Sequence, residues 1–117
     1  MIRLRLRVMV AGYNQAVAEY TLARLEITSA HPRIAPPPII DRLGSVAGGA
    51  DPYRAWRAAI RQLRAADTYI RVGAGAVVRR HSAWSRLAGA FGAVRQYAAG
   101  IETLHASGTR RRRRRSS

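Results

Sequence analysis

The chain has 117 residues and carries 21 basic side chains against 6 acidic ones, which gives a formal net charge of +15 at pH 7. This length fits one domain with or without tails, and so strong a charge indicates a polyanionic partner, most often nucleic acid and sometimes an anionic membrane. The lack of cysteine excludes disulfides and cysteine-ligated metal sites. No window is long and apolar enough to predict a membrane span, and residues 1–10 interleave arginine with apolar residues, unlike a secretory signal. We therefore expect an intracellular protein or a subunit of a particle.

Arginine supplies every basic residue of the chain, and lysine is absent. The planar guanidinium group binds phosphate oxygens two at a time, which the lysine ammonium group does not do. Codon bias in a GC-rich genome would give the same composition, and the two explanations are compatible. The arginine content therefore fits phosphate binding without requiring it.

Residues 1–29 are predicted to form an N-terminal amphipathic helix or arm. One apolar face recurs at alternating four- and three-residue steps, which is the spacing of a helix. Over residues 2–10 the alternation of arginine with apolar residues also fits a strand. The helical interpretation is favoured because a single periodicity then covers the whole segment. That face comprises Ile2, Leu6, Met9, Tyr13, Ala16, Tyr20, Ala23 and Ile27.

Residues 30–50 are predicted to be a linker rich in proline and glycine. The run Pro36-Pro37-Pro38 favours an extended, semi-rigid path with few backbone donors. A plain spacer is the preferred interpretation. The alternative is an arm that reaches across a partner subunit.

Residues 51–105 are predicted to be a helical core. Asp51 is a good N-cap and Pro52 suits the first helical position, so a helix begins there and runs to about Val72. The sequence Gly73-Ala74-Gly75 ends it, and a second helix follows from about Ala76 to Leu104. The expected apolar stripes are Trp56, Ala59, Ile60, Leu63, Ala66 and Ile70 on the first helix, and Val77, Trp84, Leu87, Phe91, Val94, Ala98 and Ile101 on the second.

Residues 106–117 contain six consecutive arginines, Arg110 to Arg115. Like-charge repulsion and the lack of apolar residues predict a tail that is disordered until an anion neutralises it. The expected fold is therefore all-α, with an N-terminal helix or arm, a proline-rich linker, a long helical hairpin and a disordered basic C-terminal tail.

The helix that begins at Pro52 is predicted to carry an arginine ridge. On a helical wheel its arginines cluster about 110° from Trp56, and the ridge from Arg54 to Arg71 is about 25 Å long. Such a ridge can follow phosphates, although an ordinary solvated face is the alternative interpretation. The ridge comprises Arg54, Arg57, Arg61, Arg64 and Arg71, and we expect further nucleic-acid contacts from Arg79, Arg80, Arg86, Arg95, Arg110, Arg111, Arg112, Arg113, Arg114 and Arg115.

The helical core is predicted to self-associate. Two helices with one apolar stripe each bury too little surface to fold alone, so the stripes are expected to close against other copies in a dimer or larger array. A compact three-helix monomer is the alternative. The expected oligomer interface comprises Tyr13, Tyr20, Trp56, Trp84 and Phe91.

The residue pattern argues against an enzyme. The acidic residues are scattered, and His31, His81 and His105 lack metal-ligand spacing. Gly73-Ala74-Gly75 lacks the rest of a phosphate-loop motif. We expect no catalytic residues, no metal and no cofactor.

A first resemblance concerns residues 87–96, Leu-Ala-Gly-Ala-Phe-Gly-Ala-Val-Arg-Gln. This stretch resembles the middle of a helix-turn-helix, in which an apolar-Ala pair precedes a turn glycine. The resemblance implies a sequence-specific DNA-binding regulator whose second helix presents Arg95 and Gln96 to bases.

A second resemblance covers about residues 52–91. The stretch from Pro52-Tyr53-Arg54-Ala55 through Ile70-Arg71-Val72-Gly73-Ala74-Gly75 to Ala90-Phe91 is similar to the helical core of major capsid proteins of rod-shaped and filamentous archaeal viruses. The resemblance implies helical subunits of a virion that dimerise and wrap double-stranded DNA without sequence preference, with Arg54 and Arg71 among the binding positions.

Together these patterns predict a structural protein that coats nucleic acid, with double-stranded DNA as the favoured partner. The helix-turn-helix regulator is the main alternative. A small basic RNA-binding protein, ribosomal or involved in packaging, is the second. A cytoplasmic, nucleoid-associated location is the alternative to a virion.

Overall fold

The computed structural model describes the backbone of residues 2–39 and 52–116, and the side chains of residues 4–39 and 58–104. These residues form α1 (Ile2–Ala30), the 3₁₀ helix η1 (Pro32–Ile34), α2 (Pro52–Thr68), the π-helical turn η2 (Tyr69–Gly73), α3 (Ala76–Arg79) and α4 (Trp84–Ser116). No strand occurs in this part of the chain, so the all-α prediction is confirmed. Residues 2–10 belong to the first helix, as the longer periodicity favoured.

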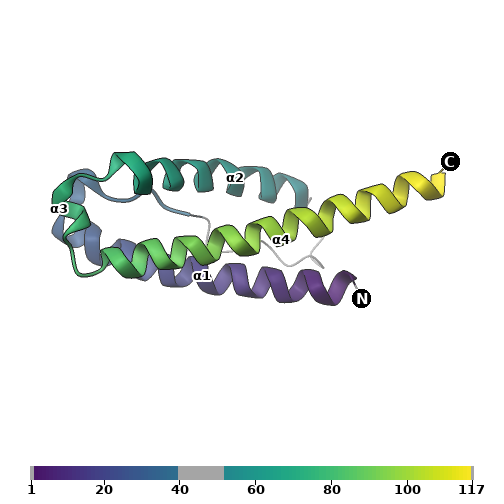
Figure 1. Ribbon diagram of the computed structural model, residues 1–117, viewed down its shortest axis with the longest axis horizontal. Helices are drawn as coiled ribbons and strands as arrows, with labels where there is room; N and C mark the ends of the chain where they lie inside the picture. The colour runs from purple at the N-terminus through teal and green to yellow at the C-terminus, as the bar shows by residue number, and fades with distance from the viewer. Residues whose placement is uncertain (1, 40–51, 117) are drawn as a thin grey trace.

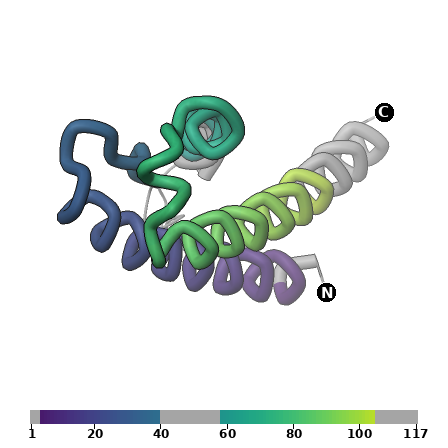
Figure 2. Tube along the Cα trace, turned by 60° about the vertical axis from the view of Figure 1, so that its left-hand side comes forward, coloured from purple at the N-terminus to yellow at the C-terminus, as the bar shows by residue number. Residues whose placement is uncertain are grey.

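The core lies between α1 and α4, which run side by side in opposite directions, with α2 to one side of the pair (Figures 1 and 2). The predicted apolar face of α1 is buried from Tyr13 to Ile27, and Val17 joins it. The stripe of α4 meets this face with Leu87, Phe91, Val94, Ala98 and Ile101. Full burial of each large side chain contributes about 1.5–3 kcal/mol, so this seam dominates the stability of the fold.

The structure corrects the pairing of the predicted hairpin. The sequence placed the hairpin between the helices that begin at Pro52 and Ala76, whereas the observed antiparallel pair is α1 with α4. The difference follows from size: α1 offers Tyr13, Tyr20 and Ile27, while the fully buried residues among the described side chains of α2 are Ala59 and Ala66. Larger side chains bury more area, so α4 packs against α1.

The second predicted helix of the hairpin is broken near its start. Residues 80–83 separate α3 from α4, because the N–H of Ala83 donates to Nδ1 of His81 (3.0 Å) rather than continuing the helical ladder. The break also changes the buried face: Val78 is buried, while Val77, which the sequence placed in the apolar stripe, is exposed.

Helix α4 extends farther than the sequence predicted. Its bounds, Trp84–Ser116, include the arginine run that we expected to be a disordered tail after residue 105. Arginine is a good helix former, and no proline follows Leu104 to stop the helix. Of the glycines in α4, Gly89 and Gly92 have open space beside them and do not interrupt the helix.

The described part of the predicted linker packs against the helices. Carbonyl oxygens of the linker accept hydrogen bonds from side chains of the helical body: Tyr20 Oη donates to Pro37 O (2.8 Å), and Arg24 Nε donates to Pro36 O (2.7 Å). Pro36 and Ile39 are buried. The linker up to Ile39 is therefore held on the molecule, and it includes the 3₁₀ helix η1, so it is not extended throughout. The predicted cap Asp51 lies outside the described residues.

Candidate nucleic-acid interface

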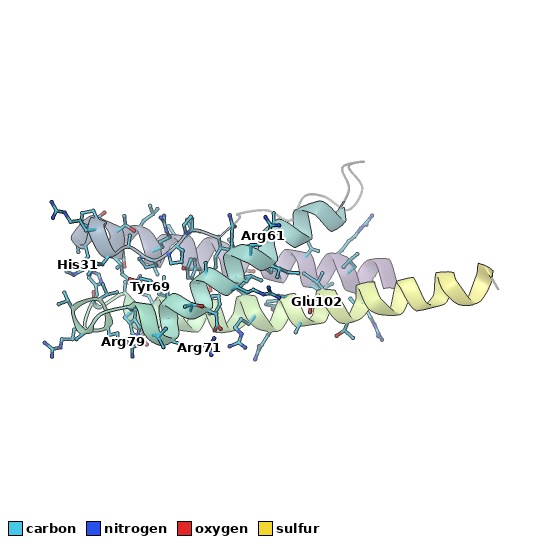
Figure 3. The ribbon with its side chains drawn as sticks, turned by 90° about the horizontal axis from the view of Figure 1, so that it is seen from above. His31, Arg61, Tyr69, Arg71, Arg79 and Glu102 are labelled. Carbon is cyan, nitrogen blue, oxygen red and sulfur yellow. The ribbon has the colours of Figure 1, made fainter. Side chains whose placement is uncertain are left out.

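The middle of the arginine ridge is exposed on α2. Arg61 and Arg64 point to solvent and form no ion pair within the described part of the chain. Figure 3 shows Arg61 along α2. The side chains of Arg54 and Arg57, which would continue the ridge toward its start, lie outside the described residues. Arg61 and Arg64 are therefore the ridge positions that the structure presents to a polyanion.

The far end of the ridge is neutralised by Asp67. The Asp67 carboxylate accepts from Arg71 one helical turn later (2.7 Å) and lies 3.6 Å from Arg95 on α4. This carboxylate therefore links α2 to α4 and offsets the charge of Arg71 and Arg95. An exposed ion pair contributes only about 0.2–1 kcal/mol, so Arg71 is weakly held, but a phosphate there would meet the Asp67 carboxylate as well.

Arg79 closes the turn after α2 rather than facing solvent freely. Helix α2 continues into the π-helical turn η2, which ends at Gly73 as Gly73-Ala74-Gly75 predicted, and the N–H of Ala74 donates to Tyr69 O (2.8 Å). Arg79 donates to the carbonyl oxygens of Arg71 (2.8 Å), Ala74 (3.3 Å) and Ile70 (3.4 Å). Figure 3 shows Arg79 beside Arg71 at this end of α2.

The same guanidinium lies over Trp84, with the Arg79 Cζ 5.9 Å from the ring centroid. Trp84 in turn packs against Tyr69 at 6.5 Å between centroids. Arg79, which we predicted as a nucleic-acid contact, thus satisfies carbonyls that the end of a helix leaves unpaired. The structure gives it a role in folding.

Both Arg86 and Arg80 were predicted to bind nucleic acid, but only Arg86 has an acidic partner among the described side chains. Arg86 forms an ion pair with Glu26 that connects α4 to α1. Arg80 is exposed at the α3–α4 turn and has no acidic partner among the described side chains. The side chains of Arg110 to Arg115 lie outside the described residues, so their predicted contacts stay predictions.

Three exposed arginines lie outside the set predicted to bind nucleic acid. Arg5 and Arg7 lie on the first turns of α1, and Arg33 lies on η1; each lacks an acidic partner in the described part of the chain. The interleaved arginines of residues 3–7 were visible in the sequence, but they were not predicted to bind nucleic acid. Uncompensated positive charge is therefore spread over several elements.

The predicted oligomer interface is corrected at three positions. Tyr13, Tyr20 and Phe91 are buried inside a single chain, with Tyr20 and Phe91 6.2 Å apart between ring centroids. They stabilise the α1–α4 pair and are not exposed to a second copy. Trp84 is partly covered by Tyr69 and Arg79, and the side chain of Trp56 lies outside the described residues.

Burial also sets the ionisation of the core tyrosines. Removal from water raises the pKa of Tyr13 to about 12, because burial disfavours the charged phenolate. The pKa of Tyr20 is raised further by the same cause, although the nearby Arg24 lowers it in part. These groups are structural and stay neutral at ordinary pH.

The end of α1 brings together two histidines that are distant in sequence. The rings of His31 and His81 meet edge to face, 6.1 Å apart between centroids. Nothing in the local pattern around either residue predicts this contact, which depends on the α1–α4 packing. Across residues 4–39 and 58–104, no group of three or more His, Asp or Glu side chains could hold a metal ion.

The turn required by a helix-turn-helix is not formed. Helix α4 is continuous across residues 87–96, so no second helix begins there. Arg95, which that arrangement would present to bases, lies instead beside Asp67. The prediction of a turn at Gly89 is therefore wrong.

Comparisons with protein-family models, curated proteins and solved structures find no match to this chain. Within the described residues, every helix is too short or too polar to cross a bilayer.

Proposed function

We propose that this protein coats nucleic acid as a structural subunit, most concretely as a capsid or nucleoprotein subunit of a filamentous virus that wraps double-stranded DNA without sequence preference. The observation that carries the proposal is the set of exposed arginines without acidic partners among the described side chains. They lie on α1, η1, α2 and the α3–α4 turn, and comprise Arg5, Arg7, Arg33, Arg61, Arg64 and Arg80.

Phosphate binding would neutralise the positive charge of these exposed arginines. A chain with a formal net charge of +15 repels itself, and that repulsion is relieved when arginines displace the counterions of a nucleic acid. Contacts of this kind position a protein on the backbone without reading bases. Basic groups spread over several elements favour coating over recognition of a single site.

The shape supports side-by-side packing along a polymer. The molecule measures 56 × 22 × 21 Å, which is longer than one turn of duplex DNA, about 34–36 Å. A rod of helices can lie along or across a duplex and contact neighbouring subunits on its sides. The filament as the form of the assembly rests on the resemblance of the residue pattern at 52–91 to archaeal filamentous-virus capsid proteins.

In this role the protein acts as a binder rather than an enzyme, in a virion or alternatively on a cellular nucleoid. The arginines described above are bulk phosphate contacts. RNA carries the same phosphate groups, so folded RNA is included in the experiment as a competitor.

The test is nuclease protection of a long random-sequence DNA duplex titrated with the full-length protein. A full-length variant with Arg110 to Arg115 changed to glutamine is tested in parallel. Continuous protection at saturation by both proteins is the expected result, because the exposed arginines of the helical body would then coat the duplex.

Other outcomes would contradict the proposal in distinct ways. Protection limited to a few sites would indicate a sequence-specific regulator. Protection lost in the glutamine variant would mean that the helical body is an ordinary solvated surface. Preferential displacement by folded RNA over duplex DNA would favour an RNA-binding packaging protein.

A further inference from the structure

Helix α1 has a second apolar face that the described part of the chain leaves uncovered. Four of its large side chains are strongly exposed: Leu4 (67%), Val8 (58%), Leu22 (65%) and Leu25 (51%). Exposed Ala11, Gln15 and Ala18 fill the positions between them. We call this set, Leu4, Val8, Ala11, Gln15, Ala18, Leu22 and Leu25, the outer stripe.

The outer stripe repeats the spacing of the buried one. Its members follow at alternating four- and three-residue steps, two residues out of phase with the face that contains Tyr13 and Tyr20. Two residues correspond to about 200° around a helix, so the stripes lie on opposite sides of α1. In Figures 1 and 2, α4 covers one side of α1 only.

This spacing is that of a helix-pairing seam. Alternating steps of four and three residues produce the heptad pattern in which one helix packs along another. From Leu4 to Leu25 the seam is about 32 Å long at 1.5 Å per residue. Small residues at its centre, Ala11 and Ala18, allow the two helix backbones to approach closely.

We propose that the outer stripe packs against the outer stripe of a second copy, with the two α1 helices antiparallel. Antiparallel pairing places Leu22 of one copy opposite Ala11 of the other and Val8 opposite Leu25. Gln15, the one polar member, then lies near the two-fold axis. A single polar side chain in such a seam fixes the register at some cost in stability.

Charge complementarity selects the antiparallel direction. One edge of the outer stripe carries Arg5 near its start and Glu19 and Glu26 farther along. In an antiparallel pair, this edge lies along the same edge of the second copy, which runs in the opposite direction. Arg5 of each copy therefore faces the partner's Glu26. Parallel helices would instead gather Arg5 and Arg7 of both copies at one end, where like charges repel.

The same charges argue for protein rather than lipid as the occupant. Glu19 and Glu26 border the stripe and would be repelled by an anionic membrane surface. Glu26 already contacts Arg86 through its Oε2 oxygen, and a carboxylate can accept from two arginines at once. Arg5 is also among the arginines proposed to contact phosphate, so the pairing is tested without nucleic acid.

Sedimentation of the full chain at high salt measures the association. We expect a dimer whose dissociation constant rises by more than about tenfold in Leu22→Glu, since a large buried side chain is replaced by a charge. Val77→Glu is the matched control, because Val77 is 57% exposed but lies outside the stripe; that variant should remain a dimer.

Cysteine cross-linking tests the direction, and the native chain contains no cysteine that would interfere. Val8→Cys mixed with Leu25→Cys should form a disulfide-linked heterodimer under mild oxidation, while neither variant alone cross-links efficiently. Efficient self-cross-linking of Val8→Cys would indicate parallel helices and overturn the proposed geometry.

Three further results would overturn the proposal itself. The first is a wild-type protein that remains monomeric at every concentration tested. The second is a loss of denaturant stability by Leu22→Glu at concentrations where the wild type is also monomeric, which would place a segment of the same chain on the stripe. The third is binding of the monomer to vesicles with anionic headgroups that Leu22→Glu abolishes, which would assign the stripe to a membrane surface.

Discussion

The ring of Tyr97 on α4 lies directly against the backbone of Gly12 on α1, so closely that a β-carbon on Gly12 would lie 2.3 Å from Tyr97 Cε1. Glycine at this position is therefore required by packing and not by backbone conformation. The contact lets α1 and α4 approach each other near the middle of α1, and Gly100 meets Met9 in a similar way.

Gly12→Ala should destabilise the protein by about 1–2 kcal/mol, because the added methyl group forces the Tyr97 ring out of its packing. Alanine is otherwise the better helix former by about 1 kcal/mol, so the sign of the effect tests the contact. Urea unfolding followed by circular dichroism measures the change.

Gly89→Ala is the matched control, since nothing lies within 4 Å of a β-carbon placed there. This substitution should be neutral or stabilising by up to about 1 kcal/mol. Equal effects of the two substitutions would show that Tyr97 does not press on Gly12.

The extent of α1 could be predicted because its periodicity is unbroken from Ile2 to Ile27. The helix that packs against α1, which is α4, could not be predicted, because periodicity shows which face of a helix is apolar and not what covers that face. On α1 the difficulty is greater, since Tyr13 and Leu22 belong to two stripes with the same spacing and only one of them meets α4. Contacts such as Gly12 with Tyr97 depend on this pairing and have no local signal.

The arginine ridge was predictable as a concentration of charge but not in its details. Arg61 is exposed as the wheel implied, whereas Arg71 and Arg95 converge on Asp67 and Arg79 turns to backbone carbonyls. The i,i+4 pair of Asp67 with Arg71 was visible in the sequence, whereas the approach of Arg95 from α4 and the carbonyl partners of Arg79 were not. A helical wheel describes one helix alone, so it counts charge without showing which charges the fold already uses.

Alkaline pH should unfold the protein through its buried tyrosines. The folded-state pKa of Tyr13 is raised to about 12, above the ordinary value of about 10. The unfolded chain therefore ionises first, and the stability present below about pH 10 is lost as the pH rises toward 12. Lysine and cysteine are absent, so tyrosine is the side chain that titrates in this window.

Urea unfolding at a series of pH values, with tyrosinate absorbance recorded in parallel, checks this prediction. Tyr13→Phe should reduce the loss of stability above pH 10, because phenylalanine does not ionise. A free energy of unfolding that stays constant up to pH 12 would show that the core tyrosines are not protected by the fold.

Arg79→Gln should lower the free energy of unfolding by about 1 kcal/mol, because the carbonyls of Arg71, Ala74 and Ile70 lose a charged donor. The neighbouring Arg80→Gln removes the same charge from an exposed side chain and should change stability by less than about 0.5 kcal/mol. Thermal unfolding compares the two variants. Indistinguishable midpoints would remove the structural role assigned to Arg79.

The exposed ridge arginines should determine the salt dependence of DNA binding. Each phosphate contact contributes about −0.9 to the slope of log affinity against log salt for duplex DNA. Arg61→Gln with Arg64→Gln should therefore reduce the magnitude of the slope by about 1.8. Fluorescence titration of a random-sequence duplex at several salt concentrations measures it.

Arg86→Gln serves as the control for that experiment, because Arg86 is already paired with Glu26. The control removes one positive charge but no free phosphate contact, so its slope should stay near the wild-type value once circular dichroism has verified folding. If Arg86→Gln instead reduced the slope as much per charge as the ridge substitutions do, binding would follow net charge alone. The ridge of α2 would then be an ordinary solvated face, and coating would have to be attributed to other arginines of the chain.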